Sequence, residues 1–238
     1  MGLGHQECKS LTEEAMNQII QLIIDNDLKP GTRLPSEFQL AQQLGVGRST
    51  LREATRLLVS RNVLEVRQGS GTFISKKRGV PDDPLGLTFK ADTPQLAVEL
   101  FDIRLMLEPN GASMAAIHAT QEQLQRLEQL CIDTEQRIVT GKSYFEGDEA
   151  FHSCLAECSG NSVLKTLIPI IVSSIYMTTV STADQFRNLT LRQHRQILNA
   201  VRRRDSMGAS LAMSEHLNTN REFFATKLQE DGDSVPDV

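Results

Sequence analysis

The sequence predicts a mainly α-helical protein, with an N-terminal winged helix-turn-helix followed by an all-helical bundle, and three observations lead to this fold class. Residues 34–74 have the pattern of a helix, a tight turn, a second helix and a hairpin with a glycine-rich tip. From Gln95 onward, apolar residues recur at helical spacing and no clear strand run interrupts them. Between the two parts, residues 76–94 contain three prolines and two glycines, which is typical of a linker.

The N-terminal part is expected to contain three helices and one hairpin. The apolar residues of the first helix fall on one face, and a Pro30-Gly31 turn follows it. Ser36 is the expected N-cap of the second helix, and Gly45 is its expected left-handed C-cap residue. The expected elements are helices over residues 11–26, between Ser36 and Gly45 and over 48–62, and strands over 63–67 and 72–75.

The C-terminal part is expected to be a bundle of six helices that ends in an acidic, disordered tail. The expected helices span residues 95–119, 121–140, 143–158, 162–182, 190–204 and 206–229. The predicted domains are a winged helix-turn-helix over residues 1–78, a linker over 79–94, a helical domain over 95–230 and the tail over 231–238.

The charge of the chain is unevenly distributed. The whole chain of 238 residues carries a formal net charge of −5, yet residues 1–80 hold eleven basic and eight acidic residues. A local excess of positive charge is what a DNA-binding surface needs, because it has to neutralise phosphates. The charge pattern therefore places a nucleic-acid interface in the N-terminal part.

The cellular compartment follows from what the sequence lacks. No window approaches the roughly 20 apolar residues of a membrane span, and the first ten residues lack the apolar core of a secretory signal. The four cysteines do not have the paired spacing of a zinc site, so free thiols in a reducing compartment are expected. Cys154 and Cys158 lie one helical turn apart, which leaves a redox switch as an alternative. A cytoplasmic protein without a membrane partner is predicted.

The expected third helix carries arginines at positions i, i+4 and i+8, which places them along one face. Arg48 and Arg52 are the candidates for base contacts, because a guanidinium pairs bidentately with guanine in the major groove. Arg56 lies one turn further and could bind either a phosphate or a local carboxylate. The other expected DNA contacts are the hydroxyls of Ser49 and Thr50 and the hairpin tip at Gln68 and Gly69. The alternative for each arginine is a solvated helix face.

Four polar residues of the helical part fall on faces that are otherwise apolar. Asp148 and His152 are one turn apart on one predicted helix, while His194 and His216 lie beside apolar residues on two others. Imidazole and carboxylate groups at such positions can hold one divalent cation inside a bundle. The alternative is that each histidine is a hydrogen-bonded core residue.

Arg104 lies on the same kind of apolar face, on the first helix of the bundle. A buried guanidinium needs an anionic partner because it does not deprotonate. Glu108, one turn away, is one candidate partner. A small carboxylate effector that bridges Arg104 and the metal is the other.

Motifs in both parts resemble those of one family. PGTRLPSEFQLAQQLGVGRSTLREATRLL and RQGSGTFI resemble the DNA-binding domain of GntR-family transcription factors. IRLMLEP, DEAFHSCLAECSGN, QHRQILNAV and AMSEHL resemble the FCD effector domain of the FadR subfamily. The resemblance implies a divalent metal, zinc, nickel or manganese, held by Asp148, His152, His194 and His216. It also implies an effector contact at Arg104 and DNA contacts at Arg48, Arg52 and Gly69.

Two residues depart from the family pattern: Phe38 stands where many relatives have arginine, and Gly47 stands where many have serine or threonine. Operator sequence or affinity is therefore expected to differ. The expected function is transcription regulation by a homodimer on a palindromic operator, as a repressor controlled by a small organic acid. The alternatives are a metal-dependent enzyme acting on a small carboxylate, and a structural DNA-binding protein with a metal-stapled bundle.

Overall fold

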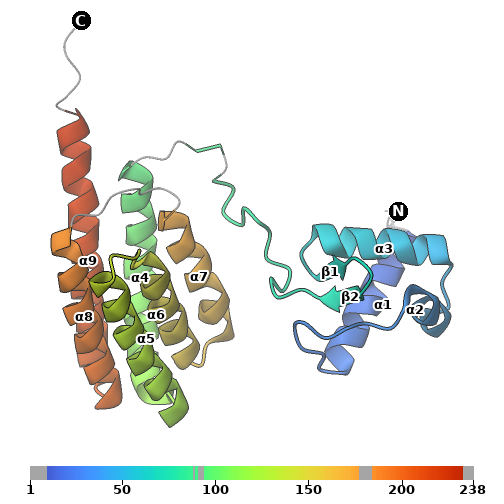
Figure 1. The fold of residues 1–238 in the computed structure, drawn as a ribbon, viewed down its shortest axis with the longest axis horizontal. Coiled ribbons are helices and arrows are strands. Elements are labelled where there is room, and N and C mark those ends of the chain that lie inside the picture. The colour runs from blue at the N-terminus through green and yellow to red at the C-terminus, as the bar shows by residue number, and fades with distance from the viewer. Residues whose placement is uncertain (1–9, 88, 91–93, 177–183, 233–238) are drawn as a thin grey trace, which may run out of the picture. The chain divides into compact units, whose positions relative to one another are not determined.

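The computed structural model describes residues 10–87, 89–90, 94–176 and 184–232, and it confirms the mainly α-helical fold with a small wing (Figure 1). Contacts divide the chain into a unit of residues 1–88 and a unit of residues 89–238, which are described separately. The predicted boundaries of the linker remain predictions. Among the described helices, none is both long enough and apolar enough to span a membrane.

The N-terminal unit consists of three helices and a hairpin: α1 (Leu11–Asp25), α2 (Glu37–Leu44), α3 (Arg48–Ser60), β1 (Leu64–Arg67) and β2 (Gly71–Ile74). Ser36 caps α2 as expected, because its side chain accepts from the backbone N–H of Gln39 while Gln39 reaches back to the backbone of Ser36. Gly45 ends α2 with φ 66°, the left-handed conformation that was expected. The predicted turn between α2 and α3 is thus confirmed.

The wing is anchored to the core of this unit. β1 and β2 pair antiparallel, with Leu64 opposite Ile74. The backbone at Arg33 adds an isolated bridge to Phe73, a pairing that the sequence pattern did not predict. The buried core that these elements share consists of Ala15, Met16, Ile19, Leu34, Leu40, Ala41, Leu51, Ala54, Leu58, Leu64 and Ile74. This core fixes the orientation of α3 relative to the wing.

The C-terminal unit is a bundle of α4 (Pro94–His118), α5 (Gln121–Val139), α6 (Phe145–Cys158), α7 (Ser162–Tyr176), α8 (Asp184–Arg202) and α9 (Ser206–Gly232). Figure 1 shows α4 running along α9, and α6 between α5 and α7. Phe101 of α4 stacks on Phe224 of α9 with ring centroids 5.5 Å apart. Cys131, Cys154 and Cys158 are free, buried thiols within these helices.

Two helices extend beyond their predicted ends. α8 begins at Asp184, six residues before the predicted start at 190, because polar residues without an apolar repeat can still continue a helix. α9 continues to Gly232, so residues 231–232 are helical and not part of a disordered tail. The rest of the predicted tail, residues 233–238, and the predicted end of α7 at 177–182 lie outside the described residues.

Candidate functional site

Three helices of the bundle bring the four predicted metal ligands together. Asp148 and His152 lie one turn apart on α6, His194 lies on α8 and His216 lies on α9. Each offers one ligand atom, these atoms all lie within 4.8 Å of one another, and all four residues are buried. Such a cluster at the meeting of three helices is the arrangement that the sequence predicted.

The distances between the donor atoms suit a single small cation. His152 Nε2 lies 3.1 Å from His216 Nε2 and 3.7 Å from an oxygen of Asp148. His194 Nε2 lies 3.1 Å from the other oxygen of Asp148. Two ligand atoms that each lie about 2.1 Å from one metal ion are about 3.0 Å apart at a right angle and about 3.4 Å at the tetrahedral angle. Two of these separations match that range and the third exceeds it, so the four residues fit a divalent metal by ligand type and, after small side-chain shifts, by spacing.

Two further residues orient the imidazole rings. Glu108 of α4 contacts Nδ1 of His152, and the side-chain oxygen of Gln193 lies 3.1 Å from Nδ1 of His216. Gln193 donates its amide N–H to Thr219, which leaves its oxygen as the acceptor for His216. In neutral rings these contacts would place the proton on Nδ1, so that the Nε2 lone pairs of His152 and His216 would face each other across 3.1 Å. Two facing lone pairs need a proton or a cation between them.

The ionisation of the cluster favours a cation. Burial lowers the pKa of His216 well below 6.5, and His194 and His152 lower it further. Burial also lowers the pKa of His194, although Asp148 opposes this shift. For Asp148, burial raises the pKa, but the three histidines outweigh it and keep the carboxyl pKa well below 3.8. Neutral rings of His194 and His216 beside the Asp148 carboxylate are the protonation states that metal ligation requires.

Arg104 is buried, with 1% of its surface exposed, and its Nε donates to an oxygen of Glu108 at 2.5 Å. Glu108 is the local partner that was predicted as the alternative to an effector. Burial raises the pKa of Glu108, but Arg104 and His152 outweigh it and lower the pKa to about 2. Arg104, Glu108 and His152 therefore form one buried chain of contacts that ends at the candidate metal site. Phe101 packs over the guanidinium at 5.0 Å.

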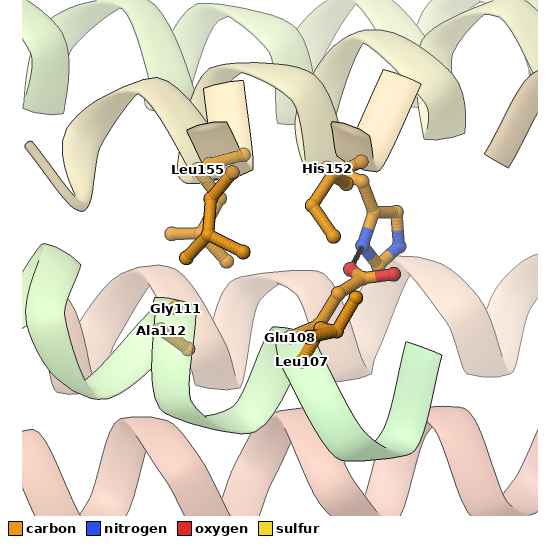
Figure 2. A pocket seen from close by; sticks show the side chains of 9 residues that line it. Leu107, Glu108, Gly111, Ala112, His152 and Leu155 are labelled. Carbon is orange, nitrogen blue, oxygen red and sulfur yellow. Dashed lines mark hydrogen bonds and ion pairs between the residues drawn. The ribbon is translucent and has the colours of Figure 1, made fainter. Parts of the chain in front are cut away.

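A small cavity adjoins this chain of contacts (Figure 2). Figure 2 shows the Glu108 carboxylate meeting the His152 ring at one side of the cavity, with Leu155, Gly111 and Ala112 at the other. Its volume is about 10 Å³, which is room for about one water molecule. An organic acid would need neighbouring side chains to move before it could enter.

A close approach of α5 fixes the start of α6. A Cβ added at Gly147 would lie 2.3 Å from Oγ1 of the buried Thr134. Only glycine therefore allows α6 to lie at this distance from α5. Since Gly147 directly precedes Asp148, the approach also sets the position of the first ligand.

The structure places the predicted DNA contacts on the surface of the N-terminal unit. Arg48, Ser49, Arg52 and Arg56 on α3, and Gln68 and Gly69 at the wing tip, are exposed, and Thr50 is half-buried. Gly69 has φ 72°, a conformation that suits the tight wing turn. Gly47, at the N-cap of α3, makes no side-chain cap hydrogen bond.

Within this unit, the arginines of α3 have neighbours that the sequence did not reveal. Arg48 Cζ lies 5.0 Å from the ring centroid of Phe38. Arg52 pairs with Glu37 at 3.2 Å, and Arg56 lies 3.8 Å from Glu53. The local carboxylate considered for Arg56 is thus present.

The residues that contact the candidate ligands were not predicted in that role. Glu108 lies 44 positions from His152, so no local pattern links them. Gln193 directly precedes His194 but contacts His216 on another helix. The only available signals were a glutamate one turn from a buried arginine and a polar residue on an inner helix face.

Comparison with known proteins agrees with this architecture. Residues 11–74 match the model of "Bacterial regulatory proteins, gntR family", and residues 99–219 match the FCD domain. A protein of Escherichia coli (strain K12) named for regulation of the L-lactate dehydrogenase operon is 32% identical over 225 residues, covering 88% of this chain and 84% of that protein.

Two further relatives have the same organisation. The Uxu operon transcriptional regulator of Escherichia coli (strain K12) is 31% identical over 221 residues, and the match covers 86% of this chain and 83% of that regulator. The solved structure of Streptococcus agalactiae GntR matches with a TM-score of 0.81 and a sequence identity of 41%, and the match covers 89% of this chain and 99% of that chain. The chain therefore belongs to the GntR family of bacterial transcription regulators and contains an FCD domain, and these relatives are named as regulators, which agrees with a non-enzyme.

Proposed function

We propose that this regulator is a repressor whose operator binding is controlled by a small organic acid bound beside a divalent cation. Asp148, His152, His194 and His216 would hold the cation. The observation that carries the proposal is the buried cluster of these four donors, whose spacing and protonation suit a metal ion. Imidazole and carboxylate ligands fit zinc, nickel or manganese.

The cation would supply a positive centre for a carboxylate oxygen. Arg104 is the second positive group nearby and is proposed to contact the effector, although Glu108 is its partner in the structure. Since the adjoining cavity holds about one water, acid binding would displace side chains around it. That displacement is the proposed signal.

The proposed DNA interface consists of α3 and the wing tip, with Arg48 and Arg52 on base edges and Arg56 on phosphate. The DNA backbone would be contacted by the hydroxyls of Ser49 and Thr50 and by the wing tip at Gln68 and Gly69. The proposed assembly is a homodimer, which would place two copies of α3 on a palindromic operator in the cytoplasm.

Metal binding can be tested on the whole chain. Protein dialysed against a chelator is titrated with Zn²⁺, Ni²⁺ and Mn²⁺ in a calorimeter, and purified protein is analysed for metal content. We expect one ion per chain for at least one of these metals, and weaker binding for His216→Gln. His118→Gln is the matched control, because His118 is an exposed histidine of α4 outside the cluster. Equal affinities in the two variants would contradict the metal site.

Effector control can be tested by operator binding in the presence of candidate acids. A DNA duplex that the protein binds is titrated with metal-loaded protein, first without an added acid and then with each small carboxylate of a panel. L-lactate comes first in this panel, because a relative is named for the L-lactate dehydrogenase operon. We expect one acid to weaken DNA binding and to raise the melting temperature of the metal-loaded protein. An acid that stabilises the protein but tightens DNA binding would contradict effector-induced release from the operator.

A further inference from the structure

Phe38 is an exposed aromatic residue beside a predicted DNA-reading arginine. It is the second residue of α2, and 58% of its surface is exposed. The guanidinium carbon of Arg48, the first residue of α3, lies 5.0 Å from its ring centroid. A cation this close to an aromatic face is attracted by the ring. The ring therefore favours one orientation of Arg48 before DNA arrives.

Arg48 has few other local contacts to orient it at this position. The positive end of the α3 dipole disfavours a cation in the first turn. Gly47, the N-cap, supplies no side-chain hydrogen bond. Arg52, one turn on, pairs instead with Glu37. The Phe38 ring is therefore a neighbour that can orient the Arg48 side chain.

The separation of the two groups lies between one and two base-pair steps. This step rests on the proposed function, in which Arg48 reads a guanine from the major groove. Base pairs stack about 3.4 Å apart. A ring centred 5.0 Å from the guanidinium carbon is therefore close enough to contact a base pair next to the one that Arg48 would read. The apolar group that a base pair presents in the major groove is the methyl of thymine.

We propose that Phe38 is a specificity-determining residue, which orients Arg48 and contacts the 5-methyl group of a thymine adjacent to the guanine that Arg48 reads. The exposed ring then has a partner of matching chemistry in the complex. The half-site would contain guanine and thymine in neighbouring base pairs, with the guanine assigned to Arg48 and the thymine to Phe38.

The first experiment selects bound duplexes from a randomised library with the full-length protein. Wild type, Phe38→Ala, Phe38→Tyr and Arg48→Ala are run in parallel, with Ile24→Ala as a control at an apolar residue of α1 that is also exposed (63%). We expect wild type, Ile24→Ala and Phe38→Tyr to select the guanine and the thymine. We expect Phe38→Ala to keep the guanine and lose the thymine preference. An unchanged thymine preference in Phe38→Ala overturns the inference.

The second experiment removes only the methyl group, by replacing the selected thymine with deoxyuridine. Burying one apolar carbon contributes about 0.8 kcal/mol, so the affinity of wild type should fall about fourfold. The affinity of Phe38→Ala should not change on this replacement. Equal losses in both proteins overturn the proposed methyl contact.

These outcomes separate the inference from the function on which it rests. If Arg48→Ala keeps the guanine preference, the assignment of Arg48 fails and the inference fails with it. If Arg48→Ala loses the guanine while Phe38→Ala changes nothing, only the role of Phe38 is refuted. Because Phe38 is exposed, its variants should keep the wild-type melting temperature, which checks that they fold.

Discussion

Replacing Glu108 by glutamine tests whether the buried chain of contacts supports the metal cluster. The two oxygens of Glu108 accept from Arg104 Nε and from His152 Nδ1. A glutamine has the same size but only one oxygen, so one of the two contacts would place a donor against a donor. The substitution also removes the negative charge that faces a buried guanidinium. Both metal affinity and folding stability should therefore fall.

The magnitude follows from the electrostatics of the site. The pKa of Glu108 is lowered from 4.5 to about 2, even though burial alone would raise it. At about 1.4 kcal/mol per tenfold change, its charged form is favoured by about 3 kcal/mol. This value agrees with the cost of about 3–5 kcal/mol for removing one partner of a buried ion pair. Loss of the group that orients a ligating histidine typically weakens metal binding by about 10–100-fold.

The assay combines two measurements on full-length protein. Urea unfolding of the metal-free form gives the free energy of unfolding, and calorimetric titration with Zn²⁺ gives the metal affinity. Glu99→Gln is the matched control, because Glu99 is an exposed carboxylate on the same helix α4. We expect Glu108→Gln to lose about 3 kcal/mol of stability and at least tenfold in affinity, and Glu99→Gln to change neither. A metal affinity of Glu108→Gln equal to that of the control would refute the orienting role of Glu108.

Three further predictions concern the same bundle. Gly147→Ala should destabilise the protein by about 1–3 kcal/mol in urea unfolding, because the added Cβ would collide with Thr134. Gly111→Ala is the control, because its added Cβ would lie 3.6 Å from the nearest side chain and should not destabilise the protein. Equal stabilities of these two variants would contradict the close approach of α5. Because burial lowers the pKa of His216, the folded metal-free protein keeps this ring neutral while the unfolded chain takes up a proton below about pH 6.5. Its stability should therefore be full above that pH and fall below it, by up to about 1.4 kcal/mol per pH unit. Urea unfolding at pH 7.5 and 5.5 measures this slope, which should be smaller in His216→Gln. Finally, chelation of a bound divalent metal should lower the melting temperature, and re-addition of the metal should restore it; an unchanged melting temperature would speak against a bound ion.

The local pattern of the sequence was sufficient for most helices and for the winged helix-turn-helix. Ser36 and Gly45 mark the ends of α2 because capping depends on residues within one turn. The positions of the four candidate ligands also followed from the sequence, because each lies on an apolar helix face. The start of α8 at Asp184 could not be predicted, since no apolar repeat marks it.

What the sequence could not supply was contact between distant residues. Glu108 has a predictable neighbour in Arg104, one turn away, but its contact with His152 depends on how α4 packs against α6. The stacking of Arg48 on Phe38 likewise depends on the angle between α2 and α3. Such contacts are set by packing of whole helices, which a periodic pattern does not specify.

The order of the four candidate ligands along the chain has a consequence for biosynthesis. Asp148 and His152 leave the ribosome first, His194 follows, and His216 is 64 residues behind His152, on the last described helix. At about 5–20 residues per second, this gap is about 3–13 s of translation. A nascent or truncated chain without α9 therefore offers only three of the four donors. Tight capture of the ion would then mark a chain whose translation has passed α9.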